Sequence, residues 1–290
     1  MKTNSIYKTS LLAAALLLAA TSCVKDELHD TSHPDYGKIT VTADWTDRGD
    51  GVDIPAEWTV TMGGYTGTET GATHSPDYLF NPGSYTLAVY NPADDIMVSG
   101  TTAAVAAADG GCIVNTPGWL FTSVQEVAIE ADTDYELTAV MRQQVRELTL
   151  VIEPAGDAAD RIENIEGSLS GAAGAFDFAT GTYGAASDVV LHFTRITEGS
   201  DAGKWTATVR LLGITGNTQT LTATLTYSDG NPADTGLESD LTEALADFNA
   251  DRTVPLTLGG TIADTPTEAG VEAGITGWEK IDGGDVNADL

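Results

Sequence analysis

The sequence predicts an all-β protein of two β-sandwiches in tandem, with one or two short connecting helices. Short segments alternate between apolar and polar residues, which is typical of half-buried strands. Glycine accounts for 31 of 290 residues, above the usual share of about 7%, and long helical patterns are scarce. The length fits one large or two ordinary domains, because a single core seldom grows past about 250 residues.

The first sandwich is expected over residues 37–144. Its apolar stripes are separated by turn residues, and Asn81-Pro82-Gly83-Ser84 supplies the fixed and positive φ angles of one such turn. Each expected strand has one apolar face that a second sheet must cover. The expected strands are 39–45, 58–62, 85–89, 127–129 and 135–141.

The second sandwich is expected over residues 145–290. Leu148, Leu150 and Ile152 alternate with Glu147, Thr149 and Val151, and the Pro-Ala-Gly run at 154–156 ends that strand. The segment 270–281 is interpreted as a late strand of this sandwich, with an element exchanged with a partner as the alternative. The other expected strands are 189–193, 205–211, 221–227 and 254–258.

Only two segments show a helical period. Ser239 or Asp240 can cap a helix, and a shorter helical turn is expected over 157–164. Both helices are expected to connect strands across the end of a sheet. The apolar face of the first would carry Leu241, Ala244, Leu245 and Phe248.

The N-terminus carries a targeting signal. Lys2 and Lys8 precede an apolar run at 11–20, and small residues follow, which indicates a lipoprotein signal peptide over residues 1–22. A ten-residue helix rises only about 15 Å, half of a bilayer core of about 30 Å, so a retained transmembrane anchor is the weaker interpretation. Residues 23–36 are polar and are expected to form a flexible lipidated tether.

Small residues directly before Cys23 resemble a lipobox, where bacterial lipoproteins are cleaved and acylated on the new N-terminal cysteine. Ala20 stands where that pattern most often has Leu. Cys112 is the other of the two cysteines, so acylation of Cys23 leaves no intramolecular disulfide. Two or three acyl chains would hold the protein stably in a membrane. An ordinary cleaved signal is the alternative.

The run Lys25-Asp26-Glu27 follows Cys23 at the offset of an export signal. It resembles the signal that sends lipoproteins of the Bacteroides group to the outer leaflet facing the medium. We therefore expect an outer-membrane lipoprotein on the cell exterior, held in the outer membrane through its N-terminal acyl chains.

The charge balance excludes one class of partner. The chain has 43 acidic and 13 basic residues and a formal charge of −30. Such a polyanion repels nucleic acid. With 42% hydrophobic residues it is too apolar for an acidic disordered tail, so it is expected to fold.

Four segments occur in the order found in FimB/Mfa-type fimbrial anchor lipoproteins, of the fimbrillin superfamily of the Bacteroides group. They are 81–91, 146–150, 165–171 with Phe176-Asp177 after it, and 245–249. The resemblance implies two transthyretin-like β-sandwiches and a lipidated N-terminus. It also implies a fimbrial anchor or assembly subunit that binds fimbrillin or pilin subunits by strand exchange. Stalk and tip adhesin subunits of the same superfamily remain alternatives.

No catalysis and no small-molecule substrate are expected. The motif at 167–171 lacks the spacing of a nucleophile elbow, and Gly203-Lys204-Trp205 lacks parts of a P-loop. His192 is expected to face outward on a strand, and His74 lies in a Gly/Thr-rich loop with no evident partner. Cys112 is expected to be a small buried or turn residue.

No cofactor or metal site is expected. His29 and His33 are interpreted as bystanders in the tether because no third ligand is evident. A loosely held structural calcium ion is the alternative to a solvated acidic surface. The residues concerned are Asp47, Asp50 and Asp53, or Asp282, Asp285 and Asp289. Asp247, Asn249 and Asp251 have the opening spacing of a calcium loop, but Arg252 replaces its turn glycine and Leu258 its bidentate glutamate, so they do not form an EF-hand.

A rival function is glycan binding by a surface lipoprotein. Trp45, Trp58 and Trp205 lie in the apolar register of their strands and are expected in the core. Trp119 is the remaining plausible stacking platform, although Leu120 and its neighbour suggest partial burial. A third hypothesis is that the protein is a purely structural lipoprotein of the cell envelope.

Overall fold

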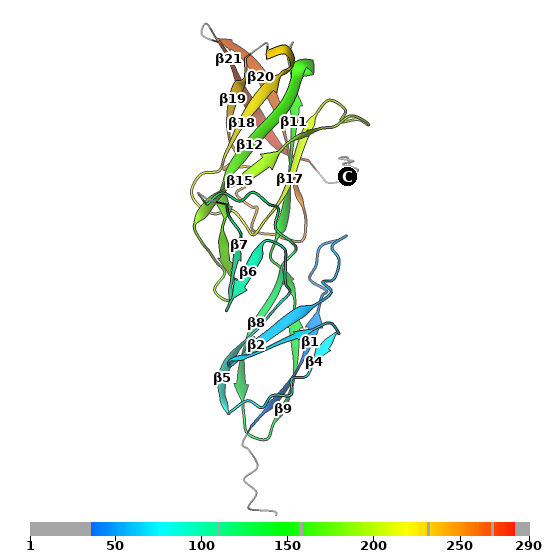
Figure 1. Ribbon diagram of the computed structural model, residues 1–290, viewed down its shortest axis with the longest axis vertical. Helices are drawn as coiled ribbons and strands as arrows, with labels where there is room; N and C mark the ends of the chain where they lie inside the picture. The colour runs from blue at the N-terminus through cyan, green and yellow to red at the C-terminus, as the bar shows by residue number, and fades with distance from the viewer. Residues whose placement is uncertain (1–35, 109–110, 157–158, 231–232, 268–269, 282–290) are drawn as a thin grey trace, which may run out of the picture.

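The computed structural model describes residues 36–281, except 109–110, 157–158, 231–232 and 268–269. The molecule is elongated, with the first strands at one end and the last strands at the other (Figure 1). Strands, two short 3-10 turns and loops account for the described residues, among which no α-helix occurs. The all-β prediction is confirmed.

Two sheets of three and five strands face each other at the N-terminal end, with strand orders β4-β1-β9 and β10-β8-β5-β2-β3. Apolar side chains from both sheets form one buried cluster, which includes Val41, Trp58, Leu87 and Met141. The strands are β1 (Lys38–Asp44), β2 (Trp58–Met62), β3 (Tyr65–Glu69), β4 (Thr73–His74), β5 (Gly83–Tyr90), β8 (Phe121–Ile129), β9 (Asp134–Val140) and β10 (Arg142–Gln143).

The alternating patterns give the inward faces of this sandwich. Ile39, Val41 and Ala43 of β1 are buried, while the residues between them are at least partly exposed. β1 runs parallel to β9 along its whole length. β2 and β3 form a hairpin through Gly63 and Gly64, whose φ angles of 57° and 85° suit a tight turn that residues with a Cβ rarely adopt.

A four-stranded sheet joins distant parts of the chain, in the order β14-β13-β7-β6. Its strands are β6 (Ile96–Ser99), β7 (Thr102–Val105), β13 (Ala175–Asp177) and β14 (Thr182–Tyr183). Because β7 pairs with β13, the β6–β7 hairpin is hydrogen-bonded through β7 to the C-terminal half of the chain. Ala103, Val105 and Ile113 accordingly lie in a second buried cluster with residues beyond 145.

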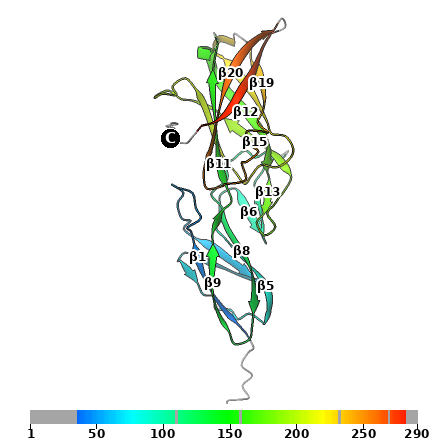
Figure 2. The same cartoon turned by 180° about the vertical axis from the view of Figure 1, so that it is seen from behind.

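The C-terminal end is a nine-stranded sheet, ordered β15-β12-β18-β19-β21-β20-β11-β17-β16 (Figure 2). Only Phe193 separates β15 from β16, so one continuous segment contributes to both ends of the strand order. The strands are β11 (Arg146–Pro154), β12 (Ile162–Ala173), β15 (Ala186–His192), β16 (Thr194–Arg195), β17 (Trp205–Leu211), β18 (Thr220–Tyr227), β19 (Thr235–Asp240), β20 (Leu256–Thr267) and β21 (Gly270–Ile281).

The apolar stripes of this sheet point into the second cluster. Leu221, Ala223, Leu225 and Tyr227 of β18 are buried, and the threonines between them are more exposed. The segment 270–281 forms β21, which lies between β19 and β20. The interpretation of this segment as a late strand of the sheet therefore agrees with the structure.

The helix expected over 241–248 is wrong. Residues 242–250 form consecutive turns, in which Leu245 N–H donates to Leu241 and Phe248 N–H donates to Leu245. The Phe248 carbonyl, near the end of this segment, accepts from Arg146 at 2.6 Å. Leu241, Leu245 and Phe248 are nevertheless buried. The apolar pattern therefore identified buried residues correctly but not their secondary structure.

Two smaller expectations are also corrected. The helical turn expected over 157–164 is reduced to the 3-10 turn η1 (Ala159–Arg161), because Ile162 already pairs with Tyr227 in β12. Val254 was expected in a strand but precedes β20 and is 53% exposed. A second 3-10 turn, η2 (Ser228–Gly230), follows β18.

Candidate functional site

Two neighbouring strands on one side of the N-terminal sandwich have unpaired outer edges. Among the described strands β9 pairs with β1 alone. β8 pairs with β5 along its length, whereas β10 covers only Phe121 and Thr122 on the other edge. The outer backbone groups of β9 and of residues 123–129 therefore face no strand in the described part of the chain. Such edges are the usual templates for an added strand.

A hollow of about 720 Å³ lies beside these edges. Gln125 Nε2 lies 3.5 Å from the Thr138 carbonyl oxygen, so this side chain spans the gap between β8 and β9. The hollow continues from that gap towards the junction of the two buried clusters. Its lining includes Ser123, Gln125, Thr138, Arg142, Asp251 and Arg252.

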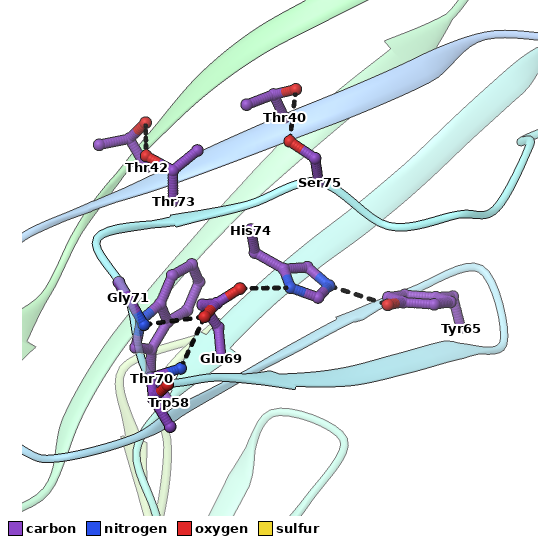
Figure 3. Close-up of polar contacts among 10 residues, drawn as sticks. All are labelled: Thr40, Thr42, Trp58, Tyr65, Glu69, Thr70, Gly71, Thr73, His74 and Ser75. Carbon is purple, nitrogen blue, oxygen red and sulfur yellow. Dashed lines mark hydrogen bonds and ion pairs between the residues drawn. The ribbon is translucent and has the colours of Figure 1, made fainter.

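The opposite side of the sandwich is closed by side chains. The edge strands there are β3 and the two-residue β4. The hydroxyls of Thr42 and Thr73 lie 3.2 Å apart, and those of Thr40 and Ser75 lie 3.1 Å apart, which holds β4 and the residue after it against β1 (Figure 3).

His74 connects β4 to β3 and is only 8% exposed. Its Nε2 lies 2.8 Å from the Tyr65 hydroxyl and its Nδ1 lies 3.4 Å from Glu69 Oε2 (Figure 3). An ionised carboxylate can only accept, so Nδ1–H donates to Glu69, and in the neutral imidazole Nε2 accepts from Tyr65. The three side chains form one hydrogen-bonded chain across the gap between the sheets.

Gly67 makes room for this chain. Tyr65, Gly67 and Glu69 share one face of β3 because side chains alternate along a strand. A Cβ at Gly67 would lie 2.7 Å from His74 Nε2 and would collide with the Tyr65 hydroxyl. The missing side chain is therefore the space into which the imidazole fits.

Backbone donors favour the ionised form of Glu69 in this cluster. The N–H groups of Gly71 and Thr70, each 2.8 Å from Glu69 Oε1, lower the pKa of that carboxyl, and the hydrogen bond from His74 adds to the effect. Burial raises the pKa of the Tyr65 phenol. The cluster is thus an anionic carboxylate, an imidazole and a neutral phenol, which suits a structural bridge that closes this edge.

This cluster was not predicted from the sequence. His74 was expected to lie in a loop without an evident partner, whereas it is buried between two edge strands. The available sequence signal is that Tyr65 and Glu69 each lie two residues from Gly67, which places all three on one face of a strand. Without the β1–β4 pairing, nothing in the sequence places His74 opposite them.

Buried polar side chains also fix the junction of the two clusters. Gln143 accepts from Gly49 N–H at 2.9 Å and donates to the Arg252 carbonyl at 2.6 Å. Arg146, 5% exposed, donates to the carbonyls of Val254 and Phe248 at 2.7 and 2.6 Å. Burial lowers the pKa of Arg146, and this effect is opposed by the Asp251 carboxylate.

Arg252 follows the turns at 242–250 and holds this part of the chain against the four-stranded sheet. Its guanidinium lies 4.5 Å from the Phe176 ring centroid and donates to the Tyr183 hydroxyl and to Gln144. The junction is therefore fixed by planar guanidinium groups, whose several donors satisfy several acceptors at once.

Trp119 lies at the same junction and packs against both clusters. The Arg210 guanidinium carbon lies 5.2 Å from its ring centroid. Asn91 holds the segment by donating to the Trp119 carbonyl at 2.9 Å and accepting from Phe121 N–H at 2.7 Å. One face of this half-buried indole is thus occupied by a cation.

The other singled-out residues are not brought together. His192 is exposed at the end of β15, and Cys112 is a partly buried free thiol. Asn249 uses its side chain to bind the backbone of Ile214, and Asp251 accepts from Thr253. Within the described ranges, no three His, Cys, Asp or Glu residues are grouped to hold a metal ion.

The residues expected at the N-terminus lie outside the described part of the chain. These are Cys23, the run Lys25-Asp26-Glu27, and His29 and His33; Asp282, Asp285 and Asp289 lie outside it at the other end. In the portion that is described, no helix is long and apolar enough to span a membrane.

Several solved structures share this fold. A candidate adhesin from Bacteroides ovatus ATCC 8483 superposes with a TM-score of 0.58 at 15% identity, covering 86% of this chain and 95% of its own. The fimbrial anchor protein Mfa2 from Porphyromonas gingivalis gives 0.56 at 14% identity, covering 82% and 95%. A candidate polysaccharide-binding protein from Bacteroides thetaiotaomicron VPI-5482 gives 0.52 at 11% identity, covering 85% and 98%.

At these identities the superpositions establish the fold alone. No curated protein matches the chain. The family described as fimbrillin-A associated anchor proteins Mfa1 and Mfa2 matches residues 60–282, which include most of both buried clusters. This match covers more than half of the sequence and agrees with the resemblance found in its ordered segments. The chain therefore belongs to the family of fimbrillin-A associated anchor proteins.

Proposed function

We propose that this protein is a cell-surface lipoprotein that anchors a fimbria. Family membership supports the fimbrial role. The sequence before the first strand supports the attachment: a signal peptide over 1–22, acylation of Cys23, and export to the outer leaflet through residues 25–27. The segment 23–36 would then act as the tether between membrane and sandwich.

The protein would hold a fimbrillin subunit by accepting one of its strands. The observation that carries this proposal is the pair of unpaired edges on β8 and β9, which border a hollow of about 720 Å³. A strand inserted there would satisfy backbone groups of the sandwich, as in β-strand addition. Main-chain hydrogen bonds would supply affinity, and alternate side chains would enter the hollow.

The nine-stranded sheet is a poorer acceptor. β15 continues through Phe193 into β16, so the same segment covers part of both ends of its strand order. The outer edge of β15 is further covered by Ile113, which donates to Asp188 at 2.8 Å and accepts from Val190 at 2.9 Å. Covering edges in this way removes the template for an added strand.

A reversible staple tests the proposal. In a background with Cys23→Ser and Cys112→Ser, Gln125→Cys and Thr138→Cys would be joined by a bifunctional thiol reagent that forms a disulfide with each cysteine, because a gap spanned by a whole glutamine side chain needs a longer bridge than a direct disulfide. Cross-linking is checked by titrating free thiols. We expect the cross-linked protein to lose binding to the purified fimbrillin subunit of the same organism and the reduced protein to regain it.

The matched control closes the other side of the sandwich. Thr42 and Thr73 are cross-strand partners whose hydroxyls are 3.2 Å apart, so a disulfide at these positions staples β1 to β4. This control variant is expected to bind fimbrillin equally well with its disulfide formed or reduced. If the variant with Gln125→Cys and Thr138→Cys bound fimbrillin equally well cross-linked and reduced, strand addition at β8 and β9 would be refuted.

A stalk or tip subunit could accept a strand at the same edge. Membrane attachment distinguishes an anchor from a stalk or tip subunit. An anchor stays in the membrane fraction when the fimbria is sheared from the cell, whereas a stalk or tip subunit leaves with the fimbria. Fractionation after shearing, followed with an antibody to this chain, decides between them.

A further inference from the structure

A groove of about 360 Å³ lies beside the start of β1. β4 pairs with β1, and Phe80 pairs with Gly37 just before β1. The loop 75–79 between these two pairings forms one wall of the groove. The starts of β1 and β9 form the rest. The polar and aromatic lining includes Lys38, Thr40, Asp77, Tyr78, Asp134 and Glu136.

Tyr78 gives the groove an exposed aromatic ring held in a fixed position. The residue is 41% exposed, although its ring packs 4.7 Å from Phe80 and 5.3 Å from Tyr65, measured between centroids. Phe80 is buried, and Tyr65 is bound to His74. Because the supporting rings are anchored, little side-chain entropy remains for a ligand to remove when it stacks on Tyr78.

Hydrogen-bonding groups surround this ring. Asp77, Asp134 and Glu136 are exposed and present carboxylate oxygens, which are acceptors. The hydroxyls of Thr40 and Ser75, 3.1 Å apart, can both donate and accept. The wall therefore offers many acceptors beside an apolar ring, and a hydroxyl-rich ligand with one apolar face matches both.

Other ligand classes fit less well. Anionic ligands are opposed by the formal charge of −30 and by the carboxylates of the groove itself. In the described residues, no group of three acidic, His or Cys side chains is arranged for a metal ion. An extended peptide finds no open edge on β1, which pairs with β9 on one side and with Phe80 and β4 on the other.

We propose that this groove binds an uncharged saccharide, with a sugar ring stacked on Tyr78 and its hydroxyls donating to Asp77, Asp134 and Glu136. Its volume lies at the lower end of the range of about 300–1,000 Å³ for small-molecule sites, which suits a short oligosaccharide. Asp134 and Glu136 belong to β9, but the groove lies on the face that they share with Lys38 and Thr40 of β1 and does not use the outer backbone edge of β9, so it does not depend on strand addition.

Saturation-transfer NMR on the mature chain with Cys23→Ser tests the site. The probes are maltotriose, cellotriose, xylotriose and mannotriose, with a heparin fragment as the anionic probe. We expect at least one neutral probe to bind and the heparin fragment not to bind. Tyr78→Ala is expected to weaken the bound probe by about tenfold.

Exposed carboxylates provide variants that keep the fold. Glu136→Gln and Asp77→Asn are each expected to weaken binding several-fold, whereas Glu238→Gln on distant β19 leaves it unchanged. Trp119→Ala, which removes the alternative stacking platform, is also expected to leave it unchanged. Binding by none of the neutral probes, or binding lost in Trp119→Ala but kept in both groove carboxylate variants, would overturn the proposal.

Discussion

Replacing Arg146 by methionine tests whether its guanidinium holds the junction of the two buried clusters. The side chain is 5% exposed and stacks 5.2 Å above the centroid of Phe248. It donates to the carbonyls of Phe248, in the turns at 242–250, and of Val254, which follows those turns. Methionine keeps most of the volume and removes all the donors.

The magnitude follows from the two short hydrogen bonds, at 2.7 and 2.6 Å. A hydrogen bond to a charged group contributes about 1.5–3 kcal/mol, so their loss costs about 3–6 kcal/mol. The contact with the Asp247 carbonyl, at 3.4 Å, adds little. Removing a desolvated cation recovers part of this, and we expect Arg146→Met to lower the free energy of unfolding by about 3–4 kcal/mol.

Urea unfolding followed by tryptophan fluorescence and by circular dichroism measures this change. Arg142→Met is the matched control: its side chain is 75% exposed and lies 4.0 Å from Asp47. The control is expected to change stability by less than about 0.5 kcal/mol. A loss below about 1 kcal/mol for Arg146→Met, or equal losses in both variants, would refute the junction argument.

Four further predictions concern the closed edge, the tether and the acid range. Gly67→Ala should destabilise the protein by about 1–3 kcal/mol in the same urea assay, because a Cβ there collides with the His74–Tyr65 contact, while Gly236→Ala, which has open space, should not. Cys23→Ser should move the protein from the membrane to the soluble fraction; unchanged fractionation would exclude acylation. Alanine at residues 25–27 should leave it membrane-bound but protected from protease added to whole cells, and continued cleavage would contradict the export role. Hydrogen bonds from Thr253 lower the pKa of Asp251, so its contribution to stability is complete above its unfolded pKa of about 3.9 and is lost as pH falls through the folded value. The melting temperatures of the wild type and Asp251→Ala should therefore differ at pH 7 and converge at low pH, and a constant gap would be the contrary result.

The strands with regular apolar alternation could be predicted from the sequence. In β1 and β18 every expected inward residue within the strand is buried, because burial on one face of a strand leaves a period of two in the sequence. Trp45, expected in the core at the end of the first stripe, follows β1 and is only partly buried. β3 escaped prediction since its residues, Tyr-Thr-Gly-Thr-Glu, form no apolar stripe on an edge strand. The parallel pairing of β1 with β9 also could not be read from a local pattern.

The pairing of β7 with β13 shows the same limit at longer range. It joins residues about 70 positions apart, and the choice between such partners depends on the packing of the whole molecule. The turns at 242–250 show a different limit. Apolar residues spaced like one face of a helix are buried there by irregular turns, and the carbonyls of Asp247 and Phe248 near the end of the segment accept from the buried guanidinium of Arg146.

The candidate sites depended on pairings of this kind. Tyr78 was not singled out because it lies in a polar loop, and only the pairing of Phe80 with Gly37 places it beside β1. Trp119, which the sequence offered as a stacking platform, carries a guanidinium over one face. The unpaired edges of β8 and β9 became visible only with the strand order of both sheets.

The parallel register of β1 and β9 determines how the sandwich would respond to mechanical tension. Lys38 pairs with Asp134 at one end and Asp44 with Val140 at the other, and the chain leaves β9 towards the junction. A pull on the N-terminus away from the second core therefore slides β1 along β9, and the hydrogen bonds of the ladder resist together in shear. A pair that opened from one end would instead lose its bonds one at a time.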